Sequence, residues 1–404
     1  MGDDNRSREP GHGGTPVVGM VGAGQLARMT AQAAIGLGIE FRVLAAAPGE
    51  SAAQVCARTV IGDYTSAGDL LGFGIGCDVV TFDHEHVPGA QLAVLGQVTA
   101  IRPGPEALVF AQDKLAMRNR LSSLRALSGR GVRCPRYRHV GTLADVLDFA
   151  ADEHAAGRPE WPVVLKAISG GYDGRGVWIC DSKEAVREVL SHGIALLAEE
   201  YVPFERELAV LVARSPKGQG ACYPVVQTVQ RDGICREVIA PAPGLSPELA
   251  ERAQWLGLSI AAELGVTGLL AVELFESGTE LVINELAMRP HNSGHWTIDA
   301  AVTSQFEQHL RAVLDLPLGG TASTAASVVM VNVLGGHDPD LYSRLVHVMA
   351  ADPVVKVHLY GKQVRPGRKV GHVTVAGDDV ERLRDRAWRA ANYLSLGTEQ
   401  PAGH

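Results

Sequence analysis

The sequence lacks the cysteine spacings of zinc-binding and disulfide-rich secreted proteins and the excess of basic residues that is typical of nucleic-acid-binding proteins. Among its 404 residues, aromatic side chains make up 5%, and 37 Lys and Arg are outnumbered by 45 Asp and Glu, for a net charge of -8. This balance argues against general nucleic-acid binding, which depends on neutralising phosphates. The six cysteines are single, without the short spacings of a zinc site, and we expect neither zinc nor disulfides: Cys56, Cys77, Cys134, Cys180, Cys222 and Cys235.

Long hydrophobic runs are also missing. The apolar stretch at 325–331 is far shorter than the ~18 residues that span a bilayer. The first fourteen residues are polar and glycine-rich, with Asp3, Asp4 and Arg6, so we expect a disordered tail rather than a secretory signal. The sequence therefore predicts a cytoplasmic protein that binds neither membrane nor nucleic acid.

Glycine is abundant, with 46 residues against about 28 at the average frequency of ~7%. Short apolar segments at 16–21, 41–44, 78–82 and 100–101 alternate with helical patterns, which is typical of a doubly wound parallel sheet. We predict a tail at 1–14 and a first domain at 15–128 that closes with a helix at 113–127. Strand and glycine-loop patterns predict a second domain at 129–207. The third, at 208–404, combines β-rich segments with helices near 247–264 and 303–314.

The first glycine motif, Gly22-Ala23-Gly24-Gln25-Leu26-Ala27, lies between a predicted strand and a predicted helix. It fits a dinucleotide fingerprint, but the expected carboxylate about 20 residues on is replaced by Ala45-Ala46-Ala47. We favour an anion site at the helix start, with a dinucleotide site or a purely structural turn as alternatives.

A second glycine loop at 169–176 follows Lys166 and contains four glycines with Asp173 and Arg175. It lacks the Gly-Lys-Ser/Thr of a Walker loop. We favour a mobile lid over a charged ligand; a long hairpin is the alternative.

Two predicted strands, 271–275 and 281–285, each carry a carboxylate among apolar residues, Glu273 and Glu285. Buried unpaired carboxylates are costly, and Mg²⁺ would neutralise both. A two-residue turn at Ser277-Gly278 would place them on opposite faces. A three-residue loop or a bulge that pairs Glu273 with Ile283 would place them on one face, about 7–8 Å apart, and we predict this second arrangement. Separate salt bridges are the alternative.

Three polar clusters complete the candidate site. The run Arg289 to Trp296 places several donors beside the predicted metal site, as an anionic substrate requires. Four cations at 362–369 suggest either a solvated basic loop or a phosphate clamp. At 83–86, we interpret Glu85 as a substrate contact and the two histidines as rim residues.

These motifs together resemble one family, the N5-carboxyaminoimidazole ribonucleotide synthetases of the ATP-grasp superfamily, which form the ATP-dependent subunit of phosphoribosylaminoimidazole carboxylase. The resemblance runs from about Val17 to Thr374. It rests on the first glycine motif, Gln112-Asp113-Lys114, the second glycine loop and Asn284-Glu285. It also rests on Arg-Pro-His-Asn-Ser-Gly-His-Trp-Thr from Arg289 and Arg-Pro-Gly-Arg-Lys-Val-Gly-His from Arg365.

The resemblance implies a three-domain ATP-grasp fold with an N-terminal doubly wound α/β domain, and a homodimer in de novo purine synthesis. The implied reaction uses ATP, Mg²⁺ and bicarbonate to form carboxyphosphate. This intermediate, or CO₂ released from it, carboxylates 5-aminoimidazole ribonucleotide, and a separate mutase receives the product. Exclusion of water by a closed lid suits this labile intermediate.

Site residues carried over by the resemblance fall into four groups. Arg289, His291 and Asn292 would orient bicarbonate and carboxyphosphate, and Glu273 and Glu285 would hold Mg²⁺. ATP would be bound by Lys114, Lys166, Gly171, Tyr172, Asp173, Gly174, Arg175, Gly176, Val177, Glu199, Glu200, Tyr201, Val202, Glu207, Gln230, Asn284 and Glu285. The ribonucleotide would be bound by Gln25, Glu85, Tyr172, Asp173, Arg175, Lys362 and Arg368.

The chain departs from the family pattern at Ala45-Ala46, at Phe82–His86, at Gln230 and at Met288. Other interpretations are an ATP-grasp formate-dependent transformylase, a nucleotide-binding regulatory protein without catalysis, and a nicotinamide-dependent reductase. Lys166, Glu273, Glu285 and Arg289 argue against a regulator, and the missing ribose carboxylate argues against a reductase.

Overall fold

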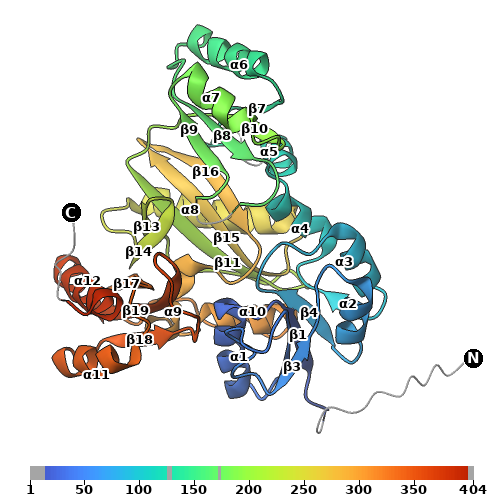
Figure 1. Cartoon of the computed structure of the whole chain (residues 1–404), viewed down its shortest axis with the longest axis vertical. Coiled ribbons are helices and arrows are strands. Elements are labelled where there is room, and N and C mark those ends of the chain that lie inside the picture. The colour runs from blue at the N-terminus through green and yellow to red at the C-terminus, as the bar shows by residue number, and fades with distance from the viewer. Residues whose placement is uncertain (1–13, 125–129, 172–173, 399–404) are drawn as a thin grey trace, which may run out of the picture.

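The computed structural model describes residues 14–124, 130–171 and 174–398. The predicted tail therefore lies outside the described residues, apart from Gly14. Three sheets organise the described chain: a parallel sheet near the N-terminus, a small antiparallel sheet, and a large mixed sheet between and beside them (Figure 1).

The N-terminal sheet has the order β3-β2-β1-β4-β5, and all its strands are parallel. Its central strand is buried along its whole length, as the continuous apolar run predicts. The predicted doubly wound sheet is confirmed, but the edge strand β3 was missed because it is short, polar at its start and largely exposed. The elements are β1 Val17–Val21, α1 Gln25–Gly36, β2 Glu40–Ala45, β3 Arg58–Ile61, α2 Ala67–Gly74, β4 Val79–Phe82, α3 Gly89–Leu95, β5 Ala100–Ile101, α4 Pro105–Gln112 and α5 Lys114–Ser122.

Helix α5 is shorter than predicted. It begins after Asp113, whose side chain accepts a hydrogen bond from the Ala116 N–H, and it ends at Ser122 rather than Leu127. The end expected at Leu127 lies outside the described residues.

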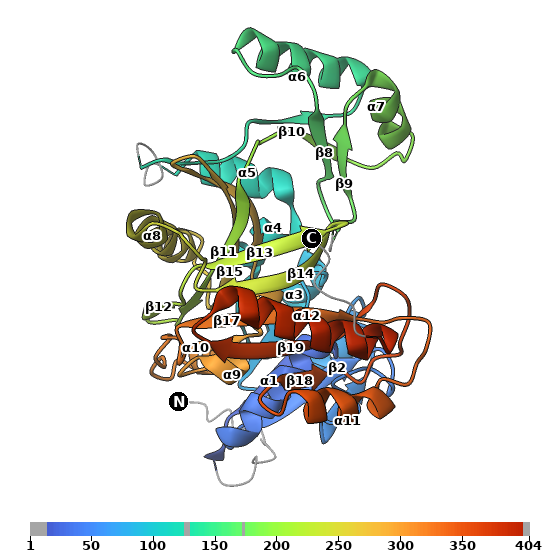
Figure 2. The ribbon, with the colours of Figure 1, turned by 90° about the vertical axis from the view of Figure 1, so that its left-hand side faces the viewer.

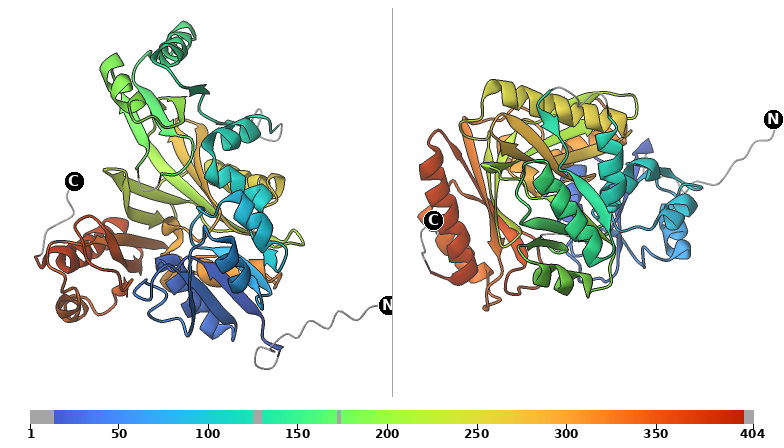
Figure 3. Two further views of the ribbon diagram at one scale, coloured as in Figure 1. Left: turned by 45° about the vertical axis from the view of Figure 1, so that its right-hand side comes forward. Right: turned by 90° about the horizontal axis from the view of Figure 1, so that it is seen from above.

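The small antiparallel sheet, here called the lid, has the order β7-β10-β8-β9 and stands at one end of the molecule (Figure 3). Its buried residues, including Phe149, Leu165 and Val186, form a hydrophobic core of their own. The predicted domain boundary at 207–208 is wrong, because the lid sheet ends at Glu200 and Glu207 lies inside a strand of the large sheet. The lid elements are β7 Tyr137–Val140, α6 Leu143–Ala155, β8 Val163–Ala167, β9 Val177–Cys180, α7 Lys183–Leu190 and β10 Leu196–Glu200.

The large sheet has the order β18-β19-β17-β14-β13-β11-β15-β16-β6, with β12 paired to β11. Helix α12 lies along β17 and β19 on one side of it (Figure 2). One hydrophobic core joins this sheet to the N-terminal domain, with Phe82 and Val272 among its members. The strands are β6 Val132–Arg133, β11 Arg206–Arg214, β12 Gly220–Cys222, β13 Val226–Arg231, β14 Ile234–Ala240, β15 Gly268–Ser277, β16 Glu280–Ala287, β17 Ser327–Leu334, β18 Lys356–Leu359 and β19 Lys369–Gly377; the helices are α8 Pro247–Glu263, α9 Thr297–Ala300, α10 Gln305–Val313, α11 Tyr342–Ala351 and α12 Val380–Leu396.

Within the described ranges, no helix combines the length and apolar character required to cross a bilayer. All six cysteines are free thiols, as expected.

Candidate active site

One cavity of about 900 Å³ lies where the three sheets meet. The N-terminal domain contributes loops that follow β1 and β4, the lid contributes β8 and the second glycine loop, and the large sheet contributes β15 and β16. Predicted site residues in its wall are Gln25, Glu85, Lys114, Lys166, Gly171, Gly174, Val177, Glu199, Glu200, Tyr201, Val202, Glu207, Gln230, Glu273, Asn284, Glu285, Arg289, His291 and Asn292. Residues distant in sequence are therefore brought to one site.

The two predicted metal carboxylates share one face of the β15–β16 hairpin. Ser277 pairs with Glu280 and Leu274 pairs with Ile283, after which a bulge shifts the register so that Glu273 lies opposite Glu285. The predicted shared face is confirmed, but the predicted pairing of Glu273 with Ile283 is wrong. Asn284 is the extra residue of the bulge, and without this shift it would take the place of Glu285.

Each carboxylate is hydrogen bonded to a basic side chain. The Glu285 Oε1 atom lies 2.6 Å from Lys114 Nζ, and Glu273 Oε1 lies 3.2 Å from His291 Nε2. Burial raises the pKa of Glu273, but His291 and Arg289 outweigh this effect and hold the pKa below its ordinary value. Glu273 is therefore an anion near neutral pH, the form that binds a hard cation.

Lys166 reaches the cavity from the lid strand β8. Its Nζ atom lies 2.8 Å from Glu199 Oε2 and 3.0 Å from Asn284 Oδ1. Both oxygens of Glu199 are hydrogen bonded, because Arg118 Nε lies 2.6 Å from Oε1. Burial opposes ionisation of Glu199, but Arg118 and Lys166 prevail and lower its pKa to about 2.

Arg118 supports the site from behind the cavity wall, and the sequence patterns did not predict this role. It is fully buried in α5 and also donates to the backbone carbonyls of Ile283, at 2.8 Å, and Asn284, at 2.7 Å. It thus holds the bulged part of β16 against α5 and the lid strand β10. The sequence did contain one indication of this role: Arg118 follows Lys114 by four residues, so the two side chains lie on the same face of a helix.

The first glycine loop binds a carboxylate of the chain itself. The Gly24 N–H donates to Asp83 Oδ2 at 2.5 Å, and a Cβ atom on Gly22 would lie only 2.0 Å from Asp83 Oδ1. The predicted anion-binding character is thus present, but Asp83 supplies the anion. Burial raises the pKa of Asp83 to about 6, although the Gly24 N–H partly offsets the increase.

Glu85 links the N-terminal domain to the donor run after β16. It accepts hydrogen bonds from Arg289 Nε at 2.8 Å and from the Met288 N–H at 3.1 Å. Burial raises its pKa, but Arg289 reverses the shift, so the pKa lies below the ordinary value. Glu85 therefore orients Arg289, a role that was not predicted for it.

Two amide side chains fix the donor run, and neither was predicted. Gln305 accepts from the His291 N–H at 2.9 Å and donates to the His291 carbonyl at 2.7 Å. Asn332 exchanges two amide hydrogen bonds with Asn292, at 3.0 and 2.7 Å. Gln305 comes from α10 and Asn332 from β17. Because both are distant in sequence from the residues that they contact, the sequence did not indicate these contacts.

Glu207 lies at the start of β11 in the cavity wall near Gln230. Burial is the main reason that its pKa rises to about 7, and the charge of Glu273 adds to the shift. At the same end, Phe204 and Phe275 stack at 4.5 Å between ring centres. This end combines an apolar wall with a carboxyl group that is often neutral at pH 7.

The second glycine loop contacts the β13–β14 turn. Gly174 has φ +74°, and a Cβ atom there would lie 2.6 Å from Gly233 Cα. Gly176 also has positive φ, and Arg175 is exposed. Tyr172 and Asp173, predicted for both ATP and the ribonucleotide, lie outside the described residues.

The segment 362–369, here called the basic run, contacts the N-terminal domain through Lys362, whose ammonium donates to Gln25 Oε1. Arg368 is exposed and donates to the Gln363 carbonyl at 3.2 Å, outside the cavity wall. Lys369, one of the four cations of this run, lines the cavity instead, although only Lys362 and Arg368 were predicted to bind the ribonucleotide. One end of the run therefore lies against the cavity, which is the arrangement that the phosphate-clamp alternative requires.

Comparisons with known proteins agree with this site. Residues 16–112 match the ribonucleotide synthetase preATP-grasp domain, 125–306 the ATP-grasp domain, and 328–386 the phosphoribosylaminoimidazole carboxylase C-terminal domain. The N5-carboxyaminoimidazole ribonucleotide synthase of Mycobacterium tuberculosis is 54% identical over 391 residues, which cover 95% of this chain and 88% of that protein. The enzyme of Corynebacterium ammoniagenes is 49% identical over 393 residues, covering 94% and 92%.

Solved structures give the same result. N5-carboxyaminoimidazole synthase from Aspergillus clavatus, in complex with ADP and 5-aminoimidazole ribonucleotide, aligns with a TM-score of 0.82 at 31% identity, covering 94% of this chain and 98% of that one. The synthetase from Thermus thermophilus aligns with a TM-score of 0.81 at 37% identity, covering 95% and 99%. This chain belongs to the N5-carboxyaminoimidazole ribonucleotide synthase family of ATP-grasp ligases.

Proposed function

We propose that this protein carboxylates 5-aminoimidazole ribonucleotide with ATP and bicarbonate in purine biosynthesis. A bicarbonate oxygen would attack the γ-phosphorus of ATP, forming carboxyphosphate and releasing ADP. The exocyclic amine of the ribonucleotide would then take the carboxyl group, losing a proton as phosphate leaves. The observation that carries this proposal is one cavity whose wall brings together Arg289, His291 and Lys166 with the carboxyl groups of Glu273 and Glu285.

The nucleotide would lie between the lid and the large sheet. Lys114 and Lys166 supply positive charge for its phosphates, and both are hydrogen bonded to residues of the bulge, Glu285 and Asn284. Lys166 is thereby held in place before the ligand binds. Preorganised charges of this kind favour a transition state in which negative charge spreads over a transferring phosphoryl group.

Mg²⁺ fits the pair Glu273 and Glu285. Oxygen ligands on one face suit this ion, and only one oxygen of each carboxylate is used by the contacts with His291 and Lys114 described above. When bound, Mg²⁺ would neutralise phosphate charge. The side chains of the protein would hold the nucleotide and the bicarbonate in line.

Bicarbonate would bind beside Arg289, His291 and Asn292. Each of the three is fixed by another residue: Glu85 holds Arg289, Gln305 holds the backbone of His291, and Asn332 holds the amide of Asn292. Rigid donors of this kind can align a small anion for attack.

The ribonucleotide would occupy the end of the cavity near Gln25 and Glu85, with Lys362 near its phosphate. The carboxyl ends of β1 and β4 meet there at the switch point of the N-terminal sheet, where open α/β sheets bind ligands. We further propose that the protein works as a cytoplasmic homodimer and passes its product to a separate mutase.

The experiment that tests this function supplies isotopically labelled bicarbonate with ATP and the ribonucleotide, and then follows the label. We expect one labelled carboxyl group in the product for each ADP formed. A parallel reaction with formate tests the transformylase alternative. ADP formation that depends on formate rather than bicarbonate would contradict the proposal.

A further inference from the structure

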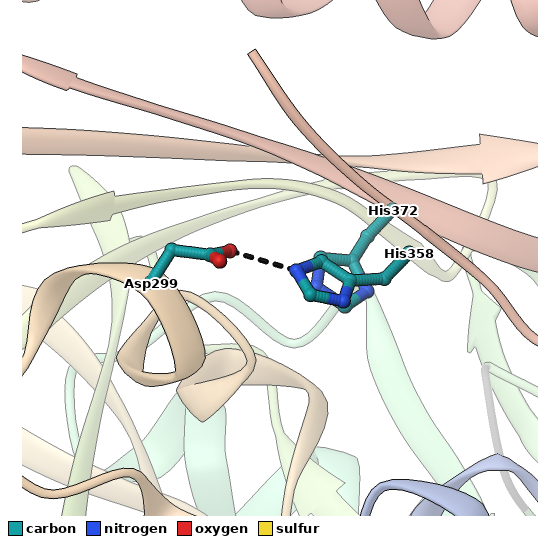
Figure 4. Close-up of side chains that lie close together, drawn as sticks. All are labelled: Asp299, His358 and His372. Atoms are coloured by element: carbon teal, nitrogen blue, oxygen red, sulfur yellow. Dashed lines mark hydrogen bonds and ion pairs between the residues drawn. The ribbon is translucent and has the colours of Figure 1, made fainter. Parts of the chain in front are cut away.

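A second polar cluster does not line the cavity and lies next to the start of the basic run 362–369. It contains Asp299 of α9 and His358 and His372 of the β18–β19 pair (Figure 4). His358 Nε2 lies 2.8 Å from Asp299 Oδ2, and His372 is completely buried. None of these residues has a role in the proposed reaction.

The sheet register brings the two histidines together. His358 and His372 are directly opposite in the antiparallel pair, and their rings stack at 4.6 Å with 17° between their planes. The carboxylate of Asp299 faces the edge of the stacked rings (Figure 4). Because a carboxylate only accepts hydrogen bonds, His358 Nε2 is the donor.

Two imidazoles and a carboxylate are a common zinc set, and one ligand atom from each lies within 4.8 Å of the others. The stacking argues against an ion, however. Imidazole lone pairs lie in the ring plane, and one ion cannot lie in the planes of two stacked, nearly parallel rings. The geometry is that of a hydrogen-bonded pair supported by a second ring.

This cluster supports the start of the basic run. His372 Nδ1 lies 2.8 Å from the hydroxyl of Tyr360, which is buried and precedes Lys362 by two residues. The Lys362 ammonium lies 5.8 Å from the centre of the Tyr360 ring, within cation–π range. His372 is also three residues from Lys369 along β19. The histidine pair is thus connected to Lys369, which lines the cavity, and through Tyr360 to Lys362, which contacts the cavity residue Gln25.

The same cluster is connected to the donor run, Arg289 to Trp296, beside which we propose that bicarbonate binds. The His295 ring lies 5.1 Å from that of His372, and Gln305 contacts His295 Nδ1 at 3.0 Å while also holding His291. Burial lowers the pKa of both His295 and His372 well below the ordinary value. These rings are therefore neutral and do not repel Lys369.

We propose that the Asp299–His358 hydrogen bond, braced by stacking on His372, positions segment 360–369 so that its cations face the ribonucleotide. His358 and Asp299 are thus positioning residues. The inference rests on the proposed function only for the identity of the ligand, because the effect on the segment exists without any ligand.

Hydrogen exchange of the full-length, ligand-free protein tests the structural part. His358→Ala should accelerate exchange of the amides in 360–369 at least about tenfold, with the lid unchanged. His347→Ala, which alters an exposed histidine of α11 in the same part of the chain, is the matched control. Unchanged exchange in 360–369, or a uniform increase over the whole chain, would overturn the inference.

Kinetics test the link to the ligand. His358→Ala should raise the KM for the ribonucleotide about tenfold while the KM for ATP stays within about twofold. His358→Gln, whose amide can still donate to Asp299, should restore most of the loss. Equal increases in both KM values, or no rescue, would overturn the positioning role. Absence of turnover in the unmodified protein would instead refute the proposed function, leaving the exchange result valid.

The melting temperature of the protein with added Zn²⁺ tests whether the cluster is a metal site instead. We expect Zn²⁺ to leave the melting temperature of the protein unchanged. An increase that is lost in His358→Ala would replace the hydrogen-bonded pair with a metal site.

Discussion

Glu273 and Glu285 face each other across the bulge but are held by different partners, so their removal should have different effects. Glu285→Ala leaves Lys114 without its ion pair and removes a proposed Mg²⁺ ligand. We expect ATP turnover to fall by about 10²–10³-fold with little change in melting temperature. Glu280→Ala, which removes an exposed carboxylate of the same strand, is the control. Normal turnover in Glu285→Ala would refute the metal assignment.

Glu207 should make stability depend on pH. Its pKa is raised by burial from 4.5 to about 7, so between these pH values the folded chain binds more protons than the unfolded chain. The free energy of unfolding should therefore fall as pH rises through this window. Denaturant unfolding of Glu207→Gln without metal or nucleotide should show a flatter profile from pH 4.5 to 7 and greater stability at pH 8. Parallel profiles for the two proteins would contradict the shift.

The sequence could predict individual residues where local chemistry alone made them unusual. Glu273 and Glu285 stood out because a carboxylate in an apolar strand is costly unless it is neutralised. Asp83, Gln305 and Asn332 did not stand out, because their roles depend on partners that only the fold brings near.

Among the structural elements, α5, β10 and the bulge of β16 meet at the fully buried side chain of Arg118. Arg118→Ala should therefore cost about 3–5 kcal/mol of unfolding free energy, because it leaves the Glu199 carboxylate and two carbonyls without their donor. Arg120 is in the same helix as Arg118, and its exposed ion pair is with Glu263 of α8. Arg120→Ala should therefore cost at most about 1 kcal/mol. Similar losses measured by urea unfolding would contradict the bridging role of Arg118.

The contact between the lid loop and the β13–β14 turn gives a second prediction at this scale. Gly170 and Gly174 both have positive φ, but a Cβ atom meets Gly233 only at Gly174. Gly174→Ala should reduce kcat/KM for ATP about tenfold, whereas Gly170→Ala carries the backbone strain without the clash and should change it less. Equal effects would show that the contact with Gly233 does not matter.

Strand register was only partly predictable. A shared Mg²⁺ required both carboxylates on one face, which demanded a three-residue loop or an irregularity between β15 and β16. This requirement did not locate the irregularity, because a three-residue loop and a bulge both satisfy it. The bulge at Asn284 places this side chain where it binds Lys166.

For the whole molecule, the N-terminal sheet was predictable because its strands and helices alternate along the chain. The large sheet was not, since it pairs β6 with β16 and β14 with β17 across long stretches of sequence. The lid boundary was misplaced for the same reason: β11 continues directly from the lid but pairs with β15.

One cavity is expected to couple ATP cleavage to bicarbonate and the ribonucleotide. The most direct test of this coupling is steady-state phosphate release with ATP, measured with each of the other two substrates omitted in turn. We expect release to require bicarbonate and to be accelerated by the ribonucleotide, and we expect its rate to fall by about 10²–10³-fold in Glu285→Ala. Phosphate release at the full rate without bicarbonate, or with formate in its place, would show that the cavity does not couple ATP cleavage to bicarbonate.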